Sequence, residues 1–97
     1  MSDLINIIRG VLNREDVEGL LAIGAPEDEY DAEAELIRQA IEDGQVKLKA
    51  KELNELIQRI WQEMFGPFSE EEMKQRQAAL ERVARQLVGA CSNGPTR

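Results

Sequence analysis

The sequence contains no histidine and only one cysteine, Cys91, among its 97 residues. Without histidine it has no Ser-His-Asp triad and no Cys-His pair, and a zinc site of cysteine and histidine has no ligands to use. Cys91 follows its nearest basic residue, Arg85, by several positions, and reactive thiols normally need a stronger positive setting. No glycine-rich phosphate loop is present either. We therefore expect no catalytic residue, no metal and no cofactor, and a protein that is not an enzyme.

Long apolar runs and positive charge are also scarce. No run of about 18 apolar residues exists that would span a bilayer. Lys and Arg number 12 against 19 Asp and Glu, which gives a net charge of −7. Because duplex nucleic acids and anionic lipid leaflets attract basic proteins, we expect neither as a partner. Asp3 stands beside Leu4 and Ile5 with no basic region before them, so no secretory signal is expected and the cytoplasm is the predicted location.

Aromatic residues make up only 4% of the chain, namely Tyr30, Trp61, Phe65 and Phe68. Large aromatic side chains dominate packing where they are few. Trp61 adjoins an apolar helical stripe, which favours the edge of the core, with an interface anchor as the alternative. Tyr30 is expected to pack its ring and to offer its hydroxyl to a backbone or carboxylate acceptor. The alternative for Tyr30 is an exposed recognition residue.

Apolar residues recur with helical spacing in four segments, at about 3–13, 31–43, 51–65 and from 69 onward. Ser69 and Glu72 form a capping box at the start of the last segment, and Gly44 and Gly89 are suitable helix ends. Residues 45–50 are expected to be an extended link or the frayed start of the third helix. The pattern predicts an all-α fold, a compact four-helix bundle-like single domain over residues 1–90. Residues 91–97 are predicted to be a disordered tail.

The connection over residues 14–29 is unusually long for a compact domain. Its apolar cluster, residues 20–23, predicts that the loop is ordered and held on the core. Asp16 is suited to cap one short turn, and Gly19 and Gly24 are free to adopt positive φ. Asp28 or Asp31 is expected to cap the helix that follows.

The segment Gly24–Glu35 carries six carboxylates within twelve residues. No window of it matches the ligand pattern of an EF-hand loop. The simplest interpretation is a solvated helix start, where carboxylates complement the helix dipole. A partner surface is the alternative, and a cation site is less favoured. The residues of that candidate partner surface are Glu27, Asp28, Glu29, Tyr30, Asp31 and Trp61.

Two segments together resemble the YugE-like family of small bacterial all-helical proteins. The first joins Gly19-Leu20-Leu21 to Gly24-Ala25-Pro26-Glu27-Asp28-Glu29-Tyr30-Asp31, and the second is Ile60-Trp61-Gln62-Glu63-Met64-Phe65-Gly66-Pro67-Phe68-Ser69. The chain departs from the family at Arg14-Glu15-Asp16-Val17, where members often carry Trp-Asp-Pro and only the aspartate is kept. The resemblance implies a helical fold and assigns no catalytic residue.

These observations favour a non-enzymatic cytoplasmic protein that acts by binding another protein. One form is an immunity-type protein, whose acidic surface neutralises a basic partner by charge complementarity. The alternative is a self-associating structural helical subunit, which the apolar residues off the main helix faces, Ile7 and Trp61, would motivate. A divalent-cation-binding protein is the third hypothesis.

Overall fold

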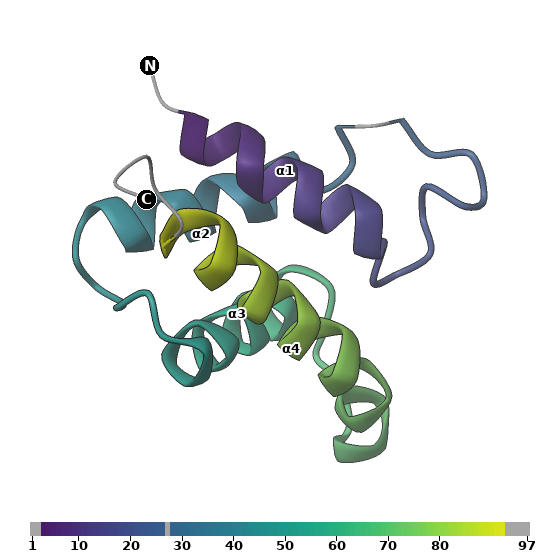
Figure 1. Ribbon diagram of the computed structural model, residues 1–97. Coiled ribbons are helices and arrows are strands. Elements are labelled where there is room, and N and C mark those ends of the chain that lie inside the picture. The colour runs from purple at the N-terminus through teal and green to yellow at the C-terminus, as the bar shows by residue number, and fades with distance from the viewer. Residues whose placement is uncertain (1–2, 27, 93–97) are drawn as a thin grey trace.

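The protein folds into four α-helices, seen in a computed structural model that describes residues 3–26 and 28–92, without the side chain of Ser92 (Figure 1). The helices are α1 (Asp3–Glu15), α2 (Asp31–Glu42), α3 (Ala50–Met64) and α4 (Glu70–Ser92). No strand occurs in the part of the chain that the structure describes. The predicted all-α single domain with a long loop between its first two helices is confirmed.

The helices surround one core in chain order. Helix α1 packs beside α2 and α4, and α3 packs beside the same two helices. The first turns of α4 extend beyond the other helices (Figure 1). The loop between α1 and α2 projects from the C-terminal end of α1. The loop and the start of α4 are therefore the two parts of the fold that reach outward.

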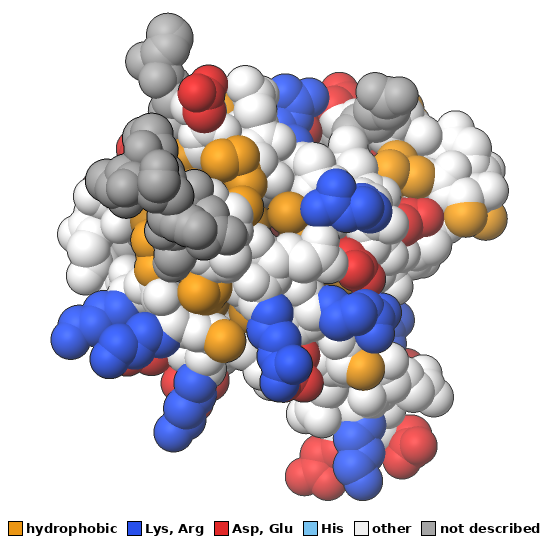
Figure 2. Space-filling model, viewed as in Figure 1, with side chains coloured by type: hydrophobic (Ala, Val, Ile, Leu, Met, Phe, Trp, Pro, Cys, Tyr) orange, Lys and Arg blue, Asp and Glu red, His pale blue; other side chains and the backbone are white. Residues whose placement is uncertain are grey.

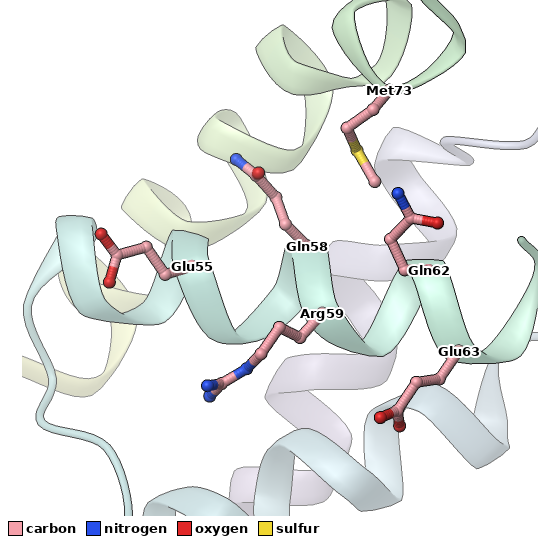
Figure 3. Close-up of a pocket in the computed structure, with 6 residues that line it drawn as sticks. All are labelled: Glu55, Gln58, Arg59, Gln62, Glu63 and Met73. Atoms are coloured by element: carbon pink, nitrogen blue, oxygen red, sulfur yellow. The ribbon is translucent and has the colours of Figure 1, made fainter. Parts of the chain in front are cut away.

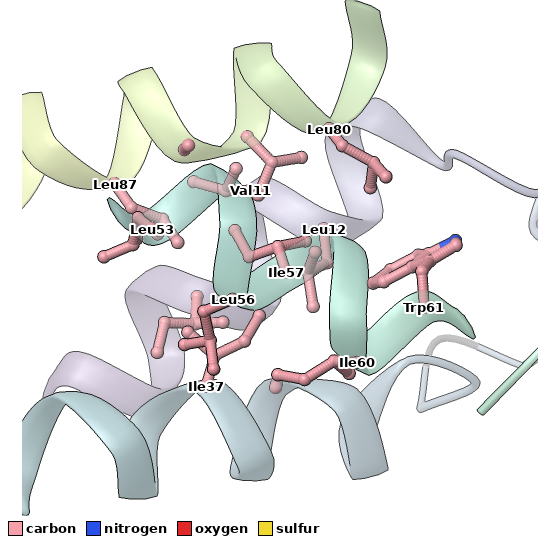
Figure 4. Close-up of a cluster of buried hydrophobic side chains, with 14 of the residues drawn as sticks. Val11, Leu12, Ile37, Leu53, Leu56, Ile57, Ile60, Trp61, Leu80 and Leu87 are labelled. Atoms are coloured by element: carbon pink, nitrogen blue, oxygen red, sulfur yellow. The ribbon is translucent and has the colours of Figure 1, made fainter. Parts of the chain in front are cut away.

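The core follows from the helical spacing of apolar residues in the sequence. On α3 the predicted stripe is buried from Leu53 to Trp61, because positions three and four apart lie on one helix face, whereas Met64 at its end is 43% exposed. Figure 4 shows side chains from all four helices meeting between them. Besides the loop-facing aromatic residues, the buried apolar side chains are Ile8, Val11, Leu12, Ala34, Ile37, Ala40, Leu53, Leu56, Ile57, Ile60, Met73, Leu80, Val83, Ala84 and Leu87.

Most helix starts and stops agree with the sequence signals. The Ser69 amide donates to Glu72 Oε1 over 2.9 Å and the Glu72 amide donates to Ser69 Oγ over 3.1 Å, which confirms the capping box. Gly44 ends α2 with φ of 76°, as predicted. Residues 45–49 form the expected link, and Lys49 has extended φ and ψ of −125° and 139°.

The cap of α2 differs from the prediction. Neither Asp28 nor Asp31 caps this helix, because Tyr30 occupies the N-cap position and makes no side-chain cap bond. Two successive backbone turns lead into the helix, with the Glu29 amide donating to Pro26 and the Asp31 amide donating to Asp28. These turns place Tyr30 at the cap with its ring directed to the core.

Helix α4 also ends later than predicted. It continues through Gly89 to Ser92, so Cys91 belongs to the helix and not to a tail. A glycine in a helix interior costs only about 1 kcal/mol, so Gly89 need not end the helix, and Cys91 beyond it is half-buried. Residues 93–97 of the predicted tail lie outside the described residues.

Candidate functional site

The loop between α1 and α2 turns around the side chain of Asp16. This carboxylate accepts the amides of Leu21 and Ala22, each over 3.0 Å. Asp16 itself has φ of 45° and Gly19 has φ of 71°, so the chain reverses tightly there. The expected short turn capped by Asp16 is confirmed, and it fixes the middle of the loop at Leu21 and Ala22.

Tyr30 closes the base of this loop. Its hydroxyl donates to Asp16 Oδ1 over 2.7 Å and accepts the Glu18 amide over 3.1 Å. The ring is 1% exposed and stacks on Trp61 with centroids 6.0 Å apart. The packing interpretation of Tyr30 is confirmed. Its place on an exposed partner surface was wrong, because both the ring and the hydroxyl are used inside the fold.

Glu18 joins the loop to α3 and α4. Its Oε2 accepts Trp61 Nε1 and Arg76 Nε, both over 2.7 Å, and its Oε1 accepts Arg76 Nη2 over 3.0 Å. Arg76 also lies over the ring of Phe68, 4.1 Å from its centroid. Trp61 is fully buried, so its assignment to the partner surface was also wrong. We call Asp16, Glu18, Tyr30, Trp61 and Arg76 the loop anchor.

Three groups of the loop anchor, Asp16, Tyr30 and Arg76, have shifted pKa values. Burial acts to raise the pKa of Asp16, but hydrogen bonds from Leu21, Tyr30 and Ala22 outweigh it and lower that pKa. Burial and the bond to Asp16 raise the pKa of Tyr30 to about 12. The hydrogen bonds to Glu18 raise the pKa of Arg76. None of these three groups titrates near neutral pH, so they suit a structural role and not proton transfer.

The outer part of the loop is divided between core and solvent. Leu20 and Leu21 are half-buried and pack on the core, whereas Ile23 is 81% exposed. The prediction that residues 20–23 are held on the core is therefore right for the leucines and wrong for Ala22 and Ile23, because the tight turn sends successive side chains in different directions. Figure 2 shows hydrophobic side chains on the protruding loop. Asp28 and Glu29 are exposed on its returning end.

The other carboxylates of the acidic segment have separate roles. Asp31 forms an ion pair with Arg9, with Oδ1 and Nε 2.8 Å apart, and Glu35 forms one with Arg38 on α2. Glu33 is the exception to the solvated helix start, since it is only 3% exposed and its Oε1 has no hydrogen-bond partner. Burial raises the pKa of Glu33, and the charges of Glu29 and Asp31 add to that rise.

Sequence reasoning missed the burial of Glu33, although one signal was present. Glu33 lies three residues after Tyr30 and four before Ile37, which places it on the buried face of α2. Among the described residues, no three acidic or cysteine side chains gather where they could hold a metal ion. Cys91 is half-buried, and burial raises the pKa of its thiol.

A shallow groove lies between α3 and the first turns of α4. It consists of two adjoining hollows of about 380 and 360 Å³, which share Gln62 and Met73. Figure 3 shows the polar side chains along α3, with Met73 facing them from α4. Gln62 is already engaged, because its Oε1 accepts the Phe68 amide over 2.8 Å. Its lining residues include no nucleophile paired with a base, and no pattern in the sequence indicated this groove.

Comparisons with known protein families, with characterised proteins and with solved structures found no match to this chain. The resemblance to the YugE-like family therefore stays a prediction. Among the described residues, no helix has the length and apolar character that crossing a bilayer requires. The function is inferred from the geometry of the loop and of the helices that hold it.

Proposed function

We propose that this protein is a non-enzymatic binding module that presents the loop over residues 16–30 to a protein with a basic surface. The observation that carries the proposal is the contrast between the fixed base of the loop and its exposed part. Its base is fixed by partly buried polar contacts to Tyr30 at the start of α2, to α3 and to α4, whereas Ile23, Asp28 and Glu29 are exposed. A binding loop held in one conformation loses little entropy when a partner docks.

Charge supports a basic partner. The chain carries a net charge of −7, and Asp28 and Glu29 place two carboxylates on the exposed return of the loop. Complementary charges raise association rates and discriminate against wrong partners. Glu27, the third member of this acidic run, lies outside the described residues. An immunity-type protein that neutralises a basic partner in the cytoplasm is the specific form we propose.

Charge reversal tests this proposal. The tagged wild-type protein would be used to capture its partner from the native cell, and the purified partner would be titrated calorimetrically. We expect the double substitution Asp28→Lys with Glu29→Lys to weaken binding at least about 10-fold, because it replaces attraction by repulsion.

The matched control is Glu70→Lys with Glu71→Lys, which makes the same charge change at the exposed start of α4. Its affinity is expected to stay within about 3-fold of the parent, since these exposed carboxylates lie on α4 and not on the loop, and salt screens exposed charges that do not contact the partner. Circular dichroism and thermal melting would verify that both variants fold. Equal losses in the two variants would contradict the role of the loop.

Self-association is the second candidate. Leu36 and Met64, on the neighbouring helices α2 and α3, are 36% and 43% exposed, which favours some apolar contact outside the chain. Light scattering over a range of protein concentrations would decide this. A strict monomer at high concentration would exclude the structural-subunit function and leave the binding module.

A further inference from the structure

Ile23 stands apart from the other large apolar side chains on the surface. It is 81% exposed, whereas Leu36, Leu48 and Met64 are between 36% and 43% exposed. We infer that Ile23 is the anchor by which the loop docks, inserting into a small apolar pocket of the partner that is flanked by lysine and arginine. This inference rests on the proposed function and names the contact that the loop makes.

The backbone that carries Ile23 is held in place. The Ala22 amide donates to Asp16 Oδ2 over 3.0 Å, and the Ile23 amide donates to the Leu20 carbonyl over 3.3 Å. The amides of Gly24 and Ala25 donate to the carbonyls of Leu21 and Leu20 over 3.1 and 3.0 Å. Four consecutive amides are therefore bonded within the loop. The β-branched side chain adds few rotamers of its own, so little freedom remains to be lost on docking.

The shape around Ile23 suits insertion. Its chain neighbours Ala22 and Gly24 are small and exposed, which makes the end of the loop narrow. Gly24 has φ of 101°, a conformation that side-chain-bearing residues rarely adopt. Leu20 and Leu21 already pack on the core. Ile23 is therefore the one large apolar group that this turn offers, and the pocket it fits is the size of a single aliphatic side chain.

Charge decides which occupant this tip fits. The exposed carboxylates of Asp28 and Glu29 follow Ile23 closely along the same loop. Two copies of a chain with net charge −7 repel each other, and an anionic lipid surface repels it as well. A different protein, with basic residues around an apolar pocket, complements both the isoleucine and the carboxylates.

Site-specific photo-crosslinking in the native cell tests the contact. A photoreactive amino acid would replace Ile23 in the full chain, and the same residue at Leu48, in the link between α2 and α3, serves as the control. We expect position 23, but not position 48, to form an adduct with one basic protein, at a peptide that lines an apolar pocket. Adducts with a second copy, with lipid, or equally from both positions would overturn the inference.

Affinity measurements with the purified partner complete the test. Truncating a central anchor typically costs a large part of the binding energy, so Ile23→Ala should weaken binding at least about 10-fold, and Ile23→Val less than about 3-fold. Leu48→Ala should leave affinity unchanged. Because the Ile23 side chain is exposed, its variants should melt at the parent temperature.

The two proposals fail in distinguishable ways. If charge reversal at Asp28 and Glu29 weakens binding and Ile23→Ala does not, the docking role of Ile23 is wrong and the proposed function stands. If neither variant weakens binding, both are wrong. A loss with Ile23→Ala alone supports the anchor and contradicts its basic surroundings.

Discussion

Asp16 and Glu33 are two carboxyl groups of one small fold whose surroundings give them opposite properties. Asp16 accepts hydrogen bonds from two backbone amides and from the hydroxyl of Tyr30, and these lower its pKa although burial acts against them. Glu33 is almost fully buried with one oxygen unpaired, and its pKa is raised. Hydrogen bonding to the charged form and loss of solvation shift a carboxyl pKa in opposite directions.

The hydroxyl of Tyr30 is expected to matter for stability. Tyr30→Phe keeps the buried ring and its stacking on Trp61, but removes the donor to Asp16 and the acceptor for the Glu18 amide. Leaving such groups unsatisfied costs about 1–3 kcal/mol. Urea unfolding should show a lower free energy of unfolding by this amount. If the Tyr30→Phe variant has the same free energy of unfolding as the parent, the prediction is wrong, because water then replaces the hydroxyl without a loss of stability.

Glu33 predicts a pH dependence of stability. Its pKa is raised above the ordinary 4.5, so its contribution to stability is fully present below that value and is lost as pH rises through the raised pKa. Glu33→Gln removes the buried charge and should be more stable than the parent at neutral pH by about 1–2 kcal/mol. Unfolding measured from about pH 4 to 7 should show this advantage shrink in acid.

Glu35→Gln is the matched control for Glu33. Its hydrogen bonds to Arg38 lower the pKa of Glu35, so the stability that they supply is present above the ordinary pKa and lost in acid. This variant should therefore be less stable than the parent at neutral pH and equal to it at low pH. The same sign of effect in both variants would contradict the assigned environments.

At the scale of the elements, the loop anchor connects segments that are distant in the sequence. Glu18 is 43 residues from Trp61 and 58 from Arg76, and it bonds to both. The ion pair with Arg76 is largely shielded, with 23% and 12% of the two side chains exposed. The loop therefore depends on α3 and α4 for its position, although it is covalently joined to α1 and α2.

Arg76→Met tests this connection. The variant leaves Glu18 without its charged partner, and removing one member of a shielded ion pair is expected to cost about 2 kcal/mol or more. Arg85→Met is the control on the same helix, because Arg85 pairs with Glu81 in solvent, with exposed fractions of 70% and 49%. Its cost should be below about 0.5 kcal/mol. Denaturant unfolding followed by Trp61 fluorescence would measure both costs. Equal costs would contradict the structural role of Arg76 in the loop anchor.

At the scale of the whole molecule, net charge is the property that bears on partners. With −7 on 97 residues, association with a basic protein should be steered by electrostatic attraction. We expect the association rate to fall by about 10-fold or more between low and high salt, while dissociation changes less. Stopped-flow mixing with the captured partner would measure this. A rate independent of salt would show that charge does not guide the encounter.

Predictions from the sequence were reliable where the interacting residues lie within a single helix or turn. The capping box of Ser69 and Glu72, the turn around Asp16 and, apart from Met64, the buried stripe of α3 formed as predicted. Each depends on residues a few positions apart, whose geometry the backbone itself sets. The predicted cap of α2 was wrong because Tyr30, with its buried ring, occupies the cap position. The predicted end of α4 at Gly89 was wrong because one interior glycine costs a helix only about 1 kcal/mol.

By itself, the sequence determined that this protein is a small, acidic, all-helical domain with an ordered loop, because periodicity, composition and turn residues are properties of the chain. Only the tertiary structure decided that Tyr30 and Trp61 lie inside, that Glu33 is buried, and that Ile23 is exposed. From the sequence alone each of these side chains could be buried or exposed, because the side chains that cover it come from helices distant in the chain. Trp61 bonds to Glu18, as does Arg76, and is therefore part of the loop anchor and not of an exposed surface. Ile23, in the middle of the same loop, is exposed and is the proposed contact.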